Sequence, residues 1–228
     1  MSEKISTTIE DYLVTIFVIE RDGEPVSGIR LAEILGVTPP TVTNTLKRMV
    51  RDGLVTMNSS HMPYLTPKGR EAASGVLRRH MLAEWMLNGL ISWSKLHKEA
   101  HDLEHAISGE VEAALIKELD DPEFCPHGNP FPGHEKAAAQ WIPLPRVENG
   151  TRGTIRRIHE FAENNASIMA FLEEKHIAPG RVVKIQEVLP VNETVTVSVE
   201  GQPVSIGFAI ARYIYIEPLP AKQDSGGN

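Results

Sequence analysis

Apolar and polar positions in the first part of the chain alternate with a helical period. In residues 9–20 apolar side chains recur every three or four positions, which predicts a helix that ends before Gly23. Ser27 occupies an N-cap position for a short second helix over residues 28–35, and Gly36 follows as its C-cap. Two short helices separated by a glycine-containing turn are therefore expected at the N-terminus.

A third helix is predicted from Thr38 to the region of Gly53. Thr38 stands at its N-cap, and two prolines occupy the first turn, where proline is tolerated. An apolar stripe would hold this helix against the domain; its members are Val42, Leu46, Met49 and Val50. The segment 54–69 then predicts a two-stranded hairpin with a polar tip, and a long helix begins at Pro67.

The helices predicted at residues 28–35 and 38–53, followed by a hairpin, are typical of a winged helix-turn-helix domain. The second of these two helices is the one that contacts DNA in such a domain. Small polar side chains on the first half of that helix can approach base edges and phosphates, and basic side chains on its second half suit phosphates. The candidate DNA-contacting residues are Thr38, Pro40, Thr41, Thr43, Asn44, Lys47, Arg48 and Arg51. The alternative is a capped surface helix of an all-α domain, which would leave the basic residues unexplained.

Histidine and glutamate side chains recur at helical spacing in the next region, residues 78–119. His80 and Glu84 are four positions apart, and a second group follows on one predicted amphipathic helix: His97, His101, Glu104 and His105. Histidines on a helix face are commonly structural, but burying so many polar groups without a partner would be costly. Nitrogen and oxygen donors suit Mn, Fe, Co, Ni and Zn, so this pattern favours a metal site.

The remaining chain changes character twice. Residues 120–146 are rich in proline, glycine and asparagine and predict a loop, in which Cys125 and His127 are interpreted as loop residues and not as ligands. From residue 150 a strand is expected over 151–158, a helix over 161–175, and then several short alternating strands that suggest a small barrel. Residues 221–228 predict a disordered tail.

Charge is distributed unevenly along the 228 residues, whose formal net charge is −7. Residues 1–78 hold nine basic and nine acidic side chains, and within residues 40–70 five basic residues face a single acid. Such a local basic patch is what phosphate contacts require, whereas the net charge is not decisive. A single cysteine suits a reducing cytosol, and no apolar run near 18 residues or secretory signal is recognised, so a cytoplasmic protein without a membrane span is expected.

The sequence resembles the diphtheria-toxin-repressor family of metal-dependent transcriptional regulators over nearly its whole length. The resemblance rests on the strings LAEILGVTPPTVTNTLKRMVRDGLV, LTPKGR, RRHMLAEWML, HKEAHDLEHAISGEVE and HGNPFPG. It implies a mainly α fold with a small β part: a winged helix-turn-helix domain (1–75), a helical dimerisation and metal-binding domain (76–140), a linker (141–149) and an SH3-like, FeoA-like β-barrel (150–220).

The family has two metal positions, and the resemblance places both on this sequence. It implies an ancillary site formed by His80, Glu84, His97, Glu160 and Glu163. It implies a primary site formed by Asp11, His101, Glu104 and His105, where iron-type members have a methionine and a cysteine in place of the first two. Losing two sulfur donors favours a harder ion. Mn(II) is therefore preferred, Fe(II) is the second choice, and Co(II), Zn(II) or Ni(II) would bind in vitro.

The function implied is that of a repressor which binds double-stranded operator DNA as a homodimer, with one dimer or two on each operator, when metal is bound. It would regulate genes of metal homeostasis. Two alternatives remain. A metal-dependent hydrolase would use the same donors to activate water, although no nucleophile motif or phosphate loop accompanies them. A DNA-binding protein with a purely structural metal would ignore chelators when it binds DNA.

Overall fold

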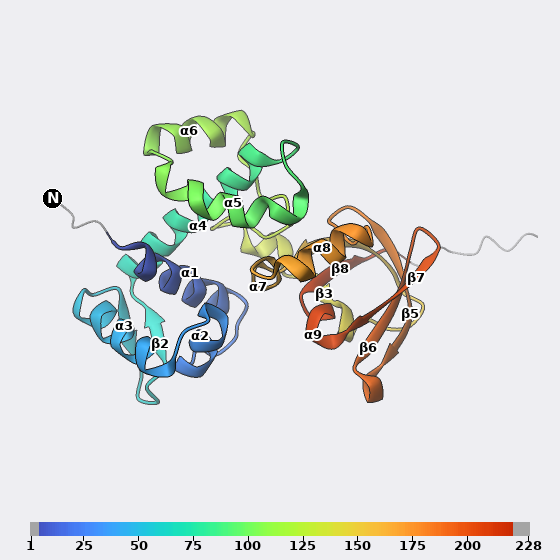
Figure 1. The fold of residues 1–228 in the computed structure, drawn as a ribbon, viewed down its shortest axis with the longest axis horizontal. Coiled ribbons are helices and arrows are strands. Elements are labelled where there is room, and N and C mark those ends of the chain that lie inside the picture. The colour runs from blue at the N-terminus through green and yellow to red at the C-terminus, as the bar shows by residue number, and fades with distance from the viewer. Residues whose placement is uncertain (1–4, 221–228) are drawn as a thin grey trace, which may run out of the picture. The chain divides into compact units, whose positions relative to one another are not determined.

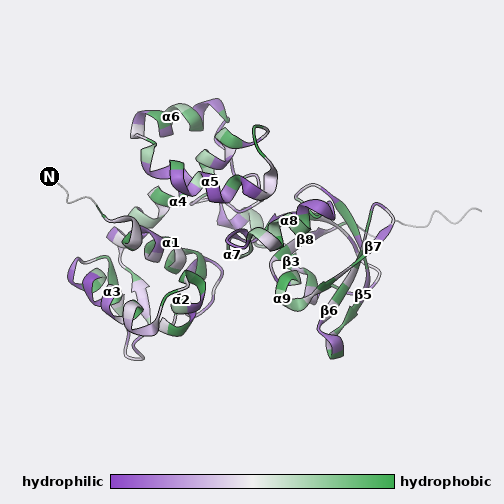
Figure 2. Ribbon diagram, in the orientation of Figure 1, coloured by the Kyte–Doolittle hydropathy of each residue, from purple (hydrophilic) through white to green (hydrophobic). Residues whose placement is uncertain are grey.

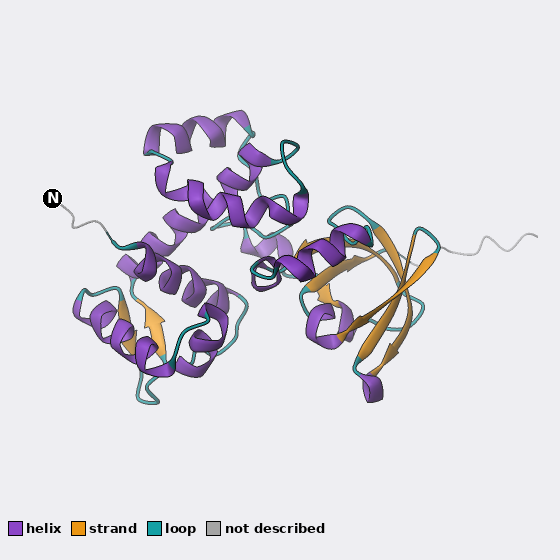
Figure 3. Ribbon diagram, in the orientation of Figure 1, coloured by secondary structure: helices purple, strands orange, loops and turns teal. Residues whose placement is uncertain are grey.

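The computed structural model describes residues 5–220, so the predicted tail at 221–228 lies outside the described residues. The chain divides into two compact units with the boundary between His80 and Met81, inside one long helix. Figure 3 shows helices throughout the first unit and the helical part of the second, with most strands gathered near the C-terminus. Within the described part, no helix is both long and apolar enough to cross a bilayer.

The first unit is a winged helix-turn-helix domain, as predicted. Its elements in chain order are α1 (Thr7–Arg21), α2 (Gly28–Leu35), α3 (Pro39–Arg51), the antiparallel strands β1 (Val55–Met57) and β2 (Pro63–Leu65), and the first part of α4 (Pro67–Leu87) (Figure 1). The Ser27 hydroxyl accepts a hydrogen bond from the Arg30 backbone N–H at 3.2 Å, and Gly36 adopts a left-handed φ of 64°. α2 therefore begins after Ser27 and ends before Gly36, as the sequence predicts.

One member of the predicted apolar stripe on α3 is misplaced. Val42, Leu46 and Met49 are buried, but Val50 is 42% exposed, and Thr45 is buried in its stead. At about 100° per residue, Val50 lies about 80° around the helix from Val42 and so leaves the buried face. The buried stripe that holds α3 is therefore shifted around the helix from Val50 towards Thr45.

The second unit begins with the helical part of the chain. It contains the end of α4, η1 (Trp93–Lys95), α5 (Leu96–Leu103), η2 (Glu104–Ala106), α6 (Gly109–Glu118) and η3 (Glu135–Ala138). The prediction of one helix carrying both His97 and His105 is wrong, because α5 ends at Leu103 and Glu104 opens a 3₁₀ turn. Ile107 is already extended, with a ψ of 113°, so the chain tightens its last turn before leaving the helix.

A six-stranded antiparallel sheet forms the C-terminal part of the second unit. Its strands are β3 (Ile142–Pro143), β4 (Arg152–Ile158), β5 (Val182–Leu189), β6 (Thr194–Val199), β7 (Gln202–Gly207) and β8 (Ile214–Pro218), in the order β3-β8-β4-β5-β6-β7. The sheet curls around a core in which every second residue of β6 is buried, and Figure 2 shows hydrophobic and hydrophilic positions side by side on its strands. The expected linker 141–149 thus contains a strand, β3, and a 3₁₀ turn, η4 (Leu144–Arg146).

Two further predictions need correction in this region. The single helix expected over residues 161–175 is two helices, α7 (Glu160–Glu163) and α8 (Ala166–Glu174). Asn165 separates them, because its side-chain oxygen accepts hydrogen bonds from the backbone N–H groups of Ser167 and Ile168, both at 3.1 Å. The strand expected near the C-terminus is preceded by a short helix, α9 (Phe208–Ala211).

Candidate metal centre

The eight candidate DNA-contacting residues all lie exposed on or beside α3. Thr38 stands at the N-cap, but its hydroxyl is hydrogen-bonded to that of Thr41 at 2.9 Å and makes no capping bond. Thr43 donates its hydroxyl to the Pro39 carbonyl oxygen, and Arg51 donates to Asp52 at 2.9 Å. The Arg51 guanidinium lowers the pKa of the Asp52 carboxyl, so these two charges largely neutralise each other.

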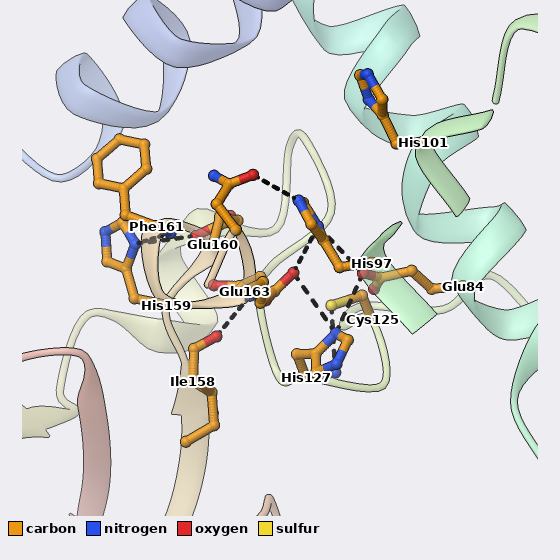
Figure 4. A network of polar contacts seen from close by, with 12 residues as sticks. Glu84, His97, His101, Cys125, His127, Ile158, His159, Glu160, Phe161 and Glu163 are labelled. Atoms are coloured by element: carbon orange, nitrogen blue, oxygen red, sulfur yellow. Dashed lines mark hydrogen bonds and ion pairs between the residues drawn. The ribbon is translucent and has the colours of Figure 1, made fainter. Parts of the chain in front are cut away.

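Five side chains from four segments of the second unit converge on one buried point, which we call the buried cluster. They are Glu84 on α4, His97 on α5, Cys125 and His127 in the loop after α6, and Glu163 on α7. Two overlapping groups of ligand atoms lie within 4.8 Å of one another: Glu84, His97 and Glu163, and Glu84, Cys125, His127 and Glu163. Figure 4 shows the five side chains turned toward one another.

Both imidazoles of the buried cluster are held by their outer nitrogens. His127 Nε2 donates to the Trp93 carbonyl oxygen at 3.2 Å, and His97 Nε2 lies 3.0 Å from the side-chain oxygen of Asn164. An Nε2–H bond of this kind is the usual support of a metal-binding histidine. It leaves Nδ1 of each ring facing the cluster.

Each Nδ1 atom meets carboxylate oxygens. His97 Nδ1 lies 2.9 Å from Glu163 Oε2, and His127 Nδ1 lies 3.1 Å from Glu84 Oε1. A lone pair and a carboxylate at such distances repel unless a proton or a cation stands between them. The arrangement therefore requires either imidazolium rings or a metal ion.

The pKa values of the cluster follow from this geometry. Burial alone would lower the pKa of His127, but the charges of Glu163 and Glu84 outweigh it and raise that pKa to about 9. The pKa of His97 is raised well above its usual value in spite of burial, because it is hydrogen-bonded to Glu163 and Glu84. Burial and the same two carboxylates raise the pKa of the Cys125 thiol. The cluster consequently holds protons that a metal would displace.

Cys125 and His127 do lie in a loop, as the sequence indicates, but sequence reasoning missed their place in the cluster. His127 is fully buried, Cys125 is 4% exposed, and the Cys125 sulfur accepts the His127 backbone N–H at 3.4 Å. The loop is fastened to the end of β4, where the Ile158 N–H donates to the His127 carbonyl oxygen at 2.8 Å. The local signal for a metal-binding loop was a cysteine and a histidine separated by one residue and followed by glycine and asparagine.

Gly128 allows this loop to approach β4. Its φ is +84°, and a Cβ there would lie 1.8 Å from the Arg156 carbonyl oxygen. Gly128→Ala should destabilise the chelated protein by about 2–4 kcal/mol, since both backbone strain and overpacking oppose it. Urea unfolding would measure this loss. Gly150→Ala is the matched control, because Gly150 has a φ of +85° with nothing within 4 Å, and it should cost about 1 kcal/mol. Equal costs for the two variants would contradict the steric argument.

Glu160 is positioned differently from Glu163, although the resemblance implies a ligand at each. Its Oε2 accepts a hydrogen bond from Arg157 at 2.9 Å. Both carboxylates are buried, but only Glu163 lies among the ligand atoms of the buried cluster. Figure 4 shows Glu160 next to His159 and Glu163 next to His97 and His127.

The residues of the implied primary site fall in both units. In the second unit, Glu104 Oε1 lies 3.5 Å from His101 Nδ1 and 3.4 Å from His105 Nε2, and we call these three residues the η2 cluster. Glu104 is only 3% exposed, whereas the His101 side chain is half exposed. Asp11 belongs to the first unit, on α1, and is half-buried. His80 is buried on α4, one helical turn before Glu84, and is the last residue of the first unit.

The donor chemistry suits divalent transition metals at both places. The buried cluster combines imidazole, carboxylate and thiol groups, which are ligands for borderline ions such as Zn(II), Co(II) and Fe(II). The η2 cluster offers only imidazole and carboxylate. The two clusters differ in softness, so if each held a metal they need not prefer the same ion.

Comparison with known proteins agrees with this organisation. Three family models match in succession: "Iron dependent repressor, N-terminal DNA binding domain" over residues 4–61, "Iron dependent repressor, metal binding and dimerisation domain" over 66–133, and "FeoA domain" over 142–218. The chain is 34% identical to the diphtheria toxin repressor of Corynebacterium diphtheriae and 31% identical to the iron-dependent repressor IdeR of Mycobacterium leprae, in each case over 96% of this chain and 100% of the relative.

Solved structures agree as well. A manganese-dependent transcriptional repressor in complex with manganese superposes with a TM-score of 0.79 at 27% identity, covering 92% of this chain and all of that one. The manganese regulator SloR gives a TM-score of 0.76 at 27% identity, covering 92% and 98%. Iron-named and manganese-named proteins thus share its fold. The chain belongs to the diphtheria toxin repressor family and is a metal-dependent transcriptional repressor with a DNA-binding domain, a metal-binding and dimerisation domain and a FeoA domain.

Proposed function

We propose that the protein represses genes of metal homeostasis in the cytoplasm by binding operator DNA as a homodimer when Mn(II) occupies its metal sites. The observation that carries this proposal is the pair of anchored imidazoles, His97 and His127, whose Nδ1 atoms face buried carboxylates. Such an arrangement is stable with a cation and requires imidazolium rings without one. Metal availability would then control the state of the second unit.

The proposed primary site joins Asp11 to the η2 cluster. Its donors would be one carboxylate and two imidazoles together with Asp11, all hard or borderline, so Mn(II) is preferred and Fe(II) is the second choice. The proposed ancillary site is the buried cluster together with His80, and it includes Cys125 and His127. Because it contains a thiol, we expect it to accept softer ions than the primary site.

Dimerisation would use the apolar surface of the helical part of the second unit. Four large hydrophobic side chains are exposed there, Leu90 at 77%, Met86 at 44%, Val111 at 41% and Leu103 at 38%. Exposed apolar side chains of this kind are typical of subunit interfaces. A homodimer would present two copies of α3 to a palindromic operator, about one turn of DNA apart or a multiple of it.

DNA binding to the chain's own upstream region tests the proposal. The protein is stripped with a chelator, and Mn(II), Fe(II), Co(II) or Zn(II) is returned at buffered free concentrations. We expect binding only with metal, and the ranking at cellular concentrations would identify the effector. Equally tight binding after chelation would instead identify a constitutive DNA-binding protein with a structural metal. Lack of binding with every metal would count against repression of its own gene.

A further inference from the structure

Arg157 is the one basic side chain buried beside the cluster in the part of the chain that the structure describes. It is only 5% exposed. The register of β4 against β8 shifts between Ile155 and Arg157, which marks a β-bulge at Arg156. The bulge leaves Arg156 exposed and turns Arg157 inward.

The Arg157 guanidinium makes contacts in three directions. It donates from Nη2 to Glu160 Oε2 at 2.9 Å and from Nε to the side-chain oxygen of Asn129 at 2.6 Å, and it lies 5.0 Å from the centre of the Tyr215 ring. The first contact holds Glu160 by charge. The second determines how the Asn129 amide is turned, because a guanidinium can only donate and therefore requires the amide oxygen.

With its oxygen facing Arg157, the Asn129 amide must present its NH₂ group to the other side. That group donates to the Ile158 carbonyl oxygen at 2.8 Å and to Glu163 Oε1 at 2.5 Å. Asn129 is fully buried, and these three bonds leave its amide no alternative orientation of equal energy. Glu163 Oε1 is thereby engaged, and its other oxygen, Oε2, faces His97 and His127 at 2.9 and 3.6 Å.

We propose that Arg157 is a positioning residue, which selects Glu163 as the carboxylate that the barrel contributes to the ancillary metal and keeps Glu160 out of that role. This inference rests on the proposed function, since it requires metal at the buried cluster. Arg157 orients Glu163 through Asn129 and holds Glu160 in a buried ion pair outside the buried cluster. The resemblance alone implies that both glutamates are ligands.

Co(II) is the probe for the test, because its absorption reports ligand geometry and thiolate binding, and competition with a chromophoric chelator gives its affinity. Glu160→Gln can still accept a hydrogen bond from Arg157, so we expect its Co(II) affinity to stay within about threefold of wild type. Glu163→Gln should lose about 10- to 100-fold. If Glu160→Gln loses as much as Glu163→Gln, Glu160 is a ligand and the proposed selection is wrong.

The double variant Arg157→Met/Glu160→Gln tests the positioning itself. It removes both charges of the buried pair, so neither is left alone in the interior. Loss of an outer partner of this kind typically costs about 10- to 100-fold in metal affinity, and we expect that loss together with an altered Co(II) spectrum. A merely structural role would lower the urea midpoint without changing the spectrum of the loaded protein.

A neighbouring ion pair provides the matched control. Arg156 lies 2.7 Å from Glu217, and the two side chains are 44% and 46% exposed. Arg156→Met/Glu217→Gln should leave Co(II) affinity and spectrum unchanged. Wild-type affinity in the Arg157 double variant would overturn the positioning role. If the wild type instead shows no thiolate-to-Co(II) absorption band, and Cys125→Ser has the same spectrum, Co(II) does not bind at the buried cluster. Both the proposed ancillary site and this inference are then wrong.

Discussion

Metal affinity at the buried cluster is expected to rise steeply with pH, by at least about 100-fold per pH unit near neutrality. At pH 7 both rings are protonated, because the pKa of His127 is about 9 and that of His97 is raised well above its usual value. Their Nδ1 atoms must lose these protons before they bind a metal. Each proton released contributes about tenfold per pH unit, so the two rings give about 100-fold, and a Cys125 thiol that binds as thiolate adds about another tenfold.

Calorimetry of Co(II) or Zn(II) binding in buffers of different ionisation enthalpy would count the released protons. We expect at least two at pH 7 for the wild type, with a further one when the Cys125 thiol binds as thiolate. His127→Gln is the informative variant, and it should release one proton fewer. Binding that releases no proton at this site would mean that the imidazoles do not face the metal through Nδ1.

The same histidines make the stability of the metal-free protein fall as the pH rises, whereas metal affinity rises. The folded pKa of His127 lies above its ordinary value of 6.5, so protonation stabilises the folded state. That contribution is complete below pH 6.5 and is lost as the pH rises through about 9. The metal-free second unit therefore loses stability over the range in which metal binds more tightly.

Glu104→Gln is expected to abolish the activation of DNA binding by metal, with little change in the fold. The carboxylate is buried between His101 and His105, and one oxygen lies near both rings. An amide of the same shape removes the negative charge that a cation needs there. Allosteric couplings reach about 100-fold, and we expect the metal-dependent gain in operator affinity to fall by that amount.

Operator binding with and without saturating Mn(II), together with urea unfolding of the chelated protein, separates function from folding. Glu99→Gln is the control, since Glu99 is exposed on α5, the helix that leads into the η2 cluster, and should respond to Mn(II) as the wild type does. The coupling is reciprocal, so operator DNA should also tighten Mn(II) binding to the wild type and not to Glu104→Gln. A variant that is activated like the wild type would remove the η2 cluster from the switch.

Local patterns in the sequence were sufficient for most of the elements and for the candidate ligands that recur at helical spacing. The caps of α2 at Ser27 and Gly36, the hairpin before α4 and the alternation of β6 depend on neighbours within a few residues, so each could be predicted. His80 and Glu84 share a face of α4 for the same reason. The break between α7 and α8 also depends on a local feature, the Asn165 cap. It was not predicted, because the apolar periodicity continues across it.

Only the tertiary structure decided which donors meet. Cys125 and His127 are about forty residues from Glu84 and from Glu163, and their loop has the polar, irregular composition of a connection. Burial there depends on Gly128 against the Arg156 carbonyl oxygen and on a bulge in β4, both set by long-range packing. Their positions in the sequence do not tell Glu160 and Glu163 apart as ligands. In the structure Glu160 is bound by the buried Arg157, whereas Glu163 is bound by Asn129 and faces the buried cluster. Sequence periodicity specifies the face on which a side chain lies, but the register shift of β4 against β8 that turns Arg157 inward, and the loop that brings Asn129 to it, come from tertiary packing.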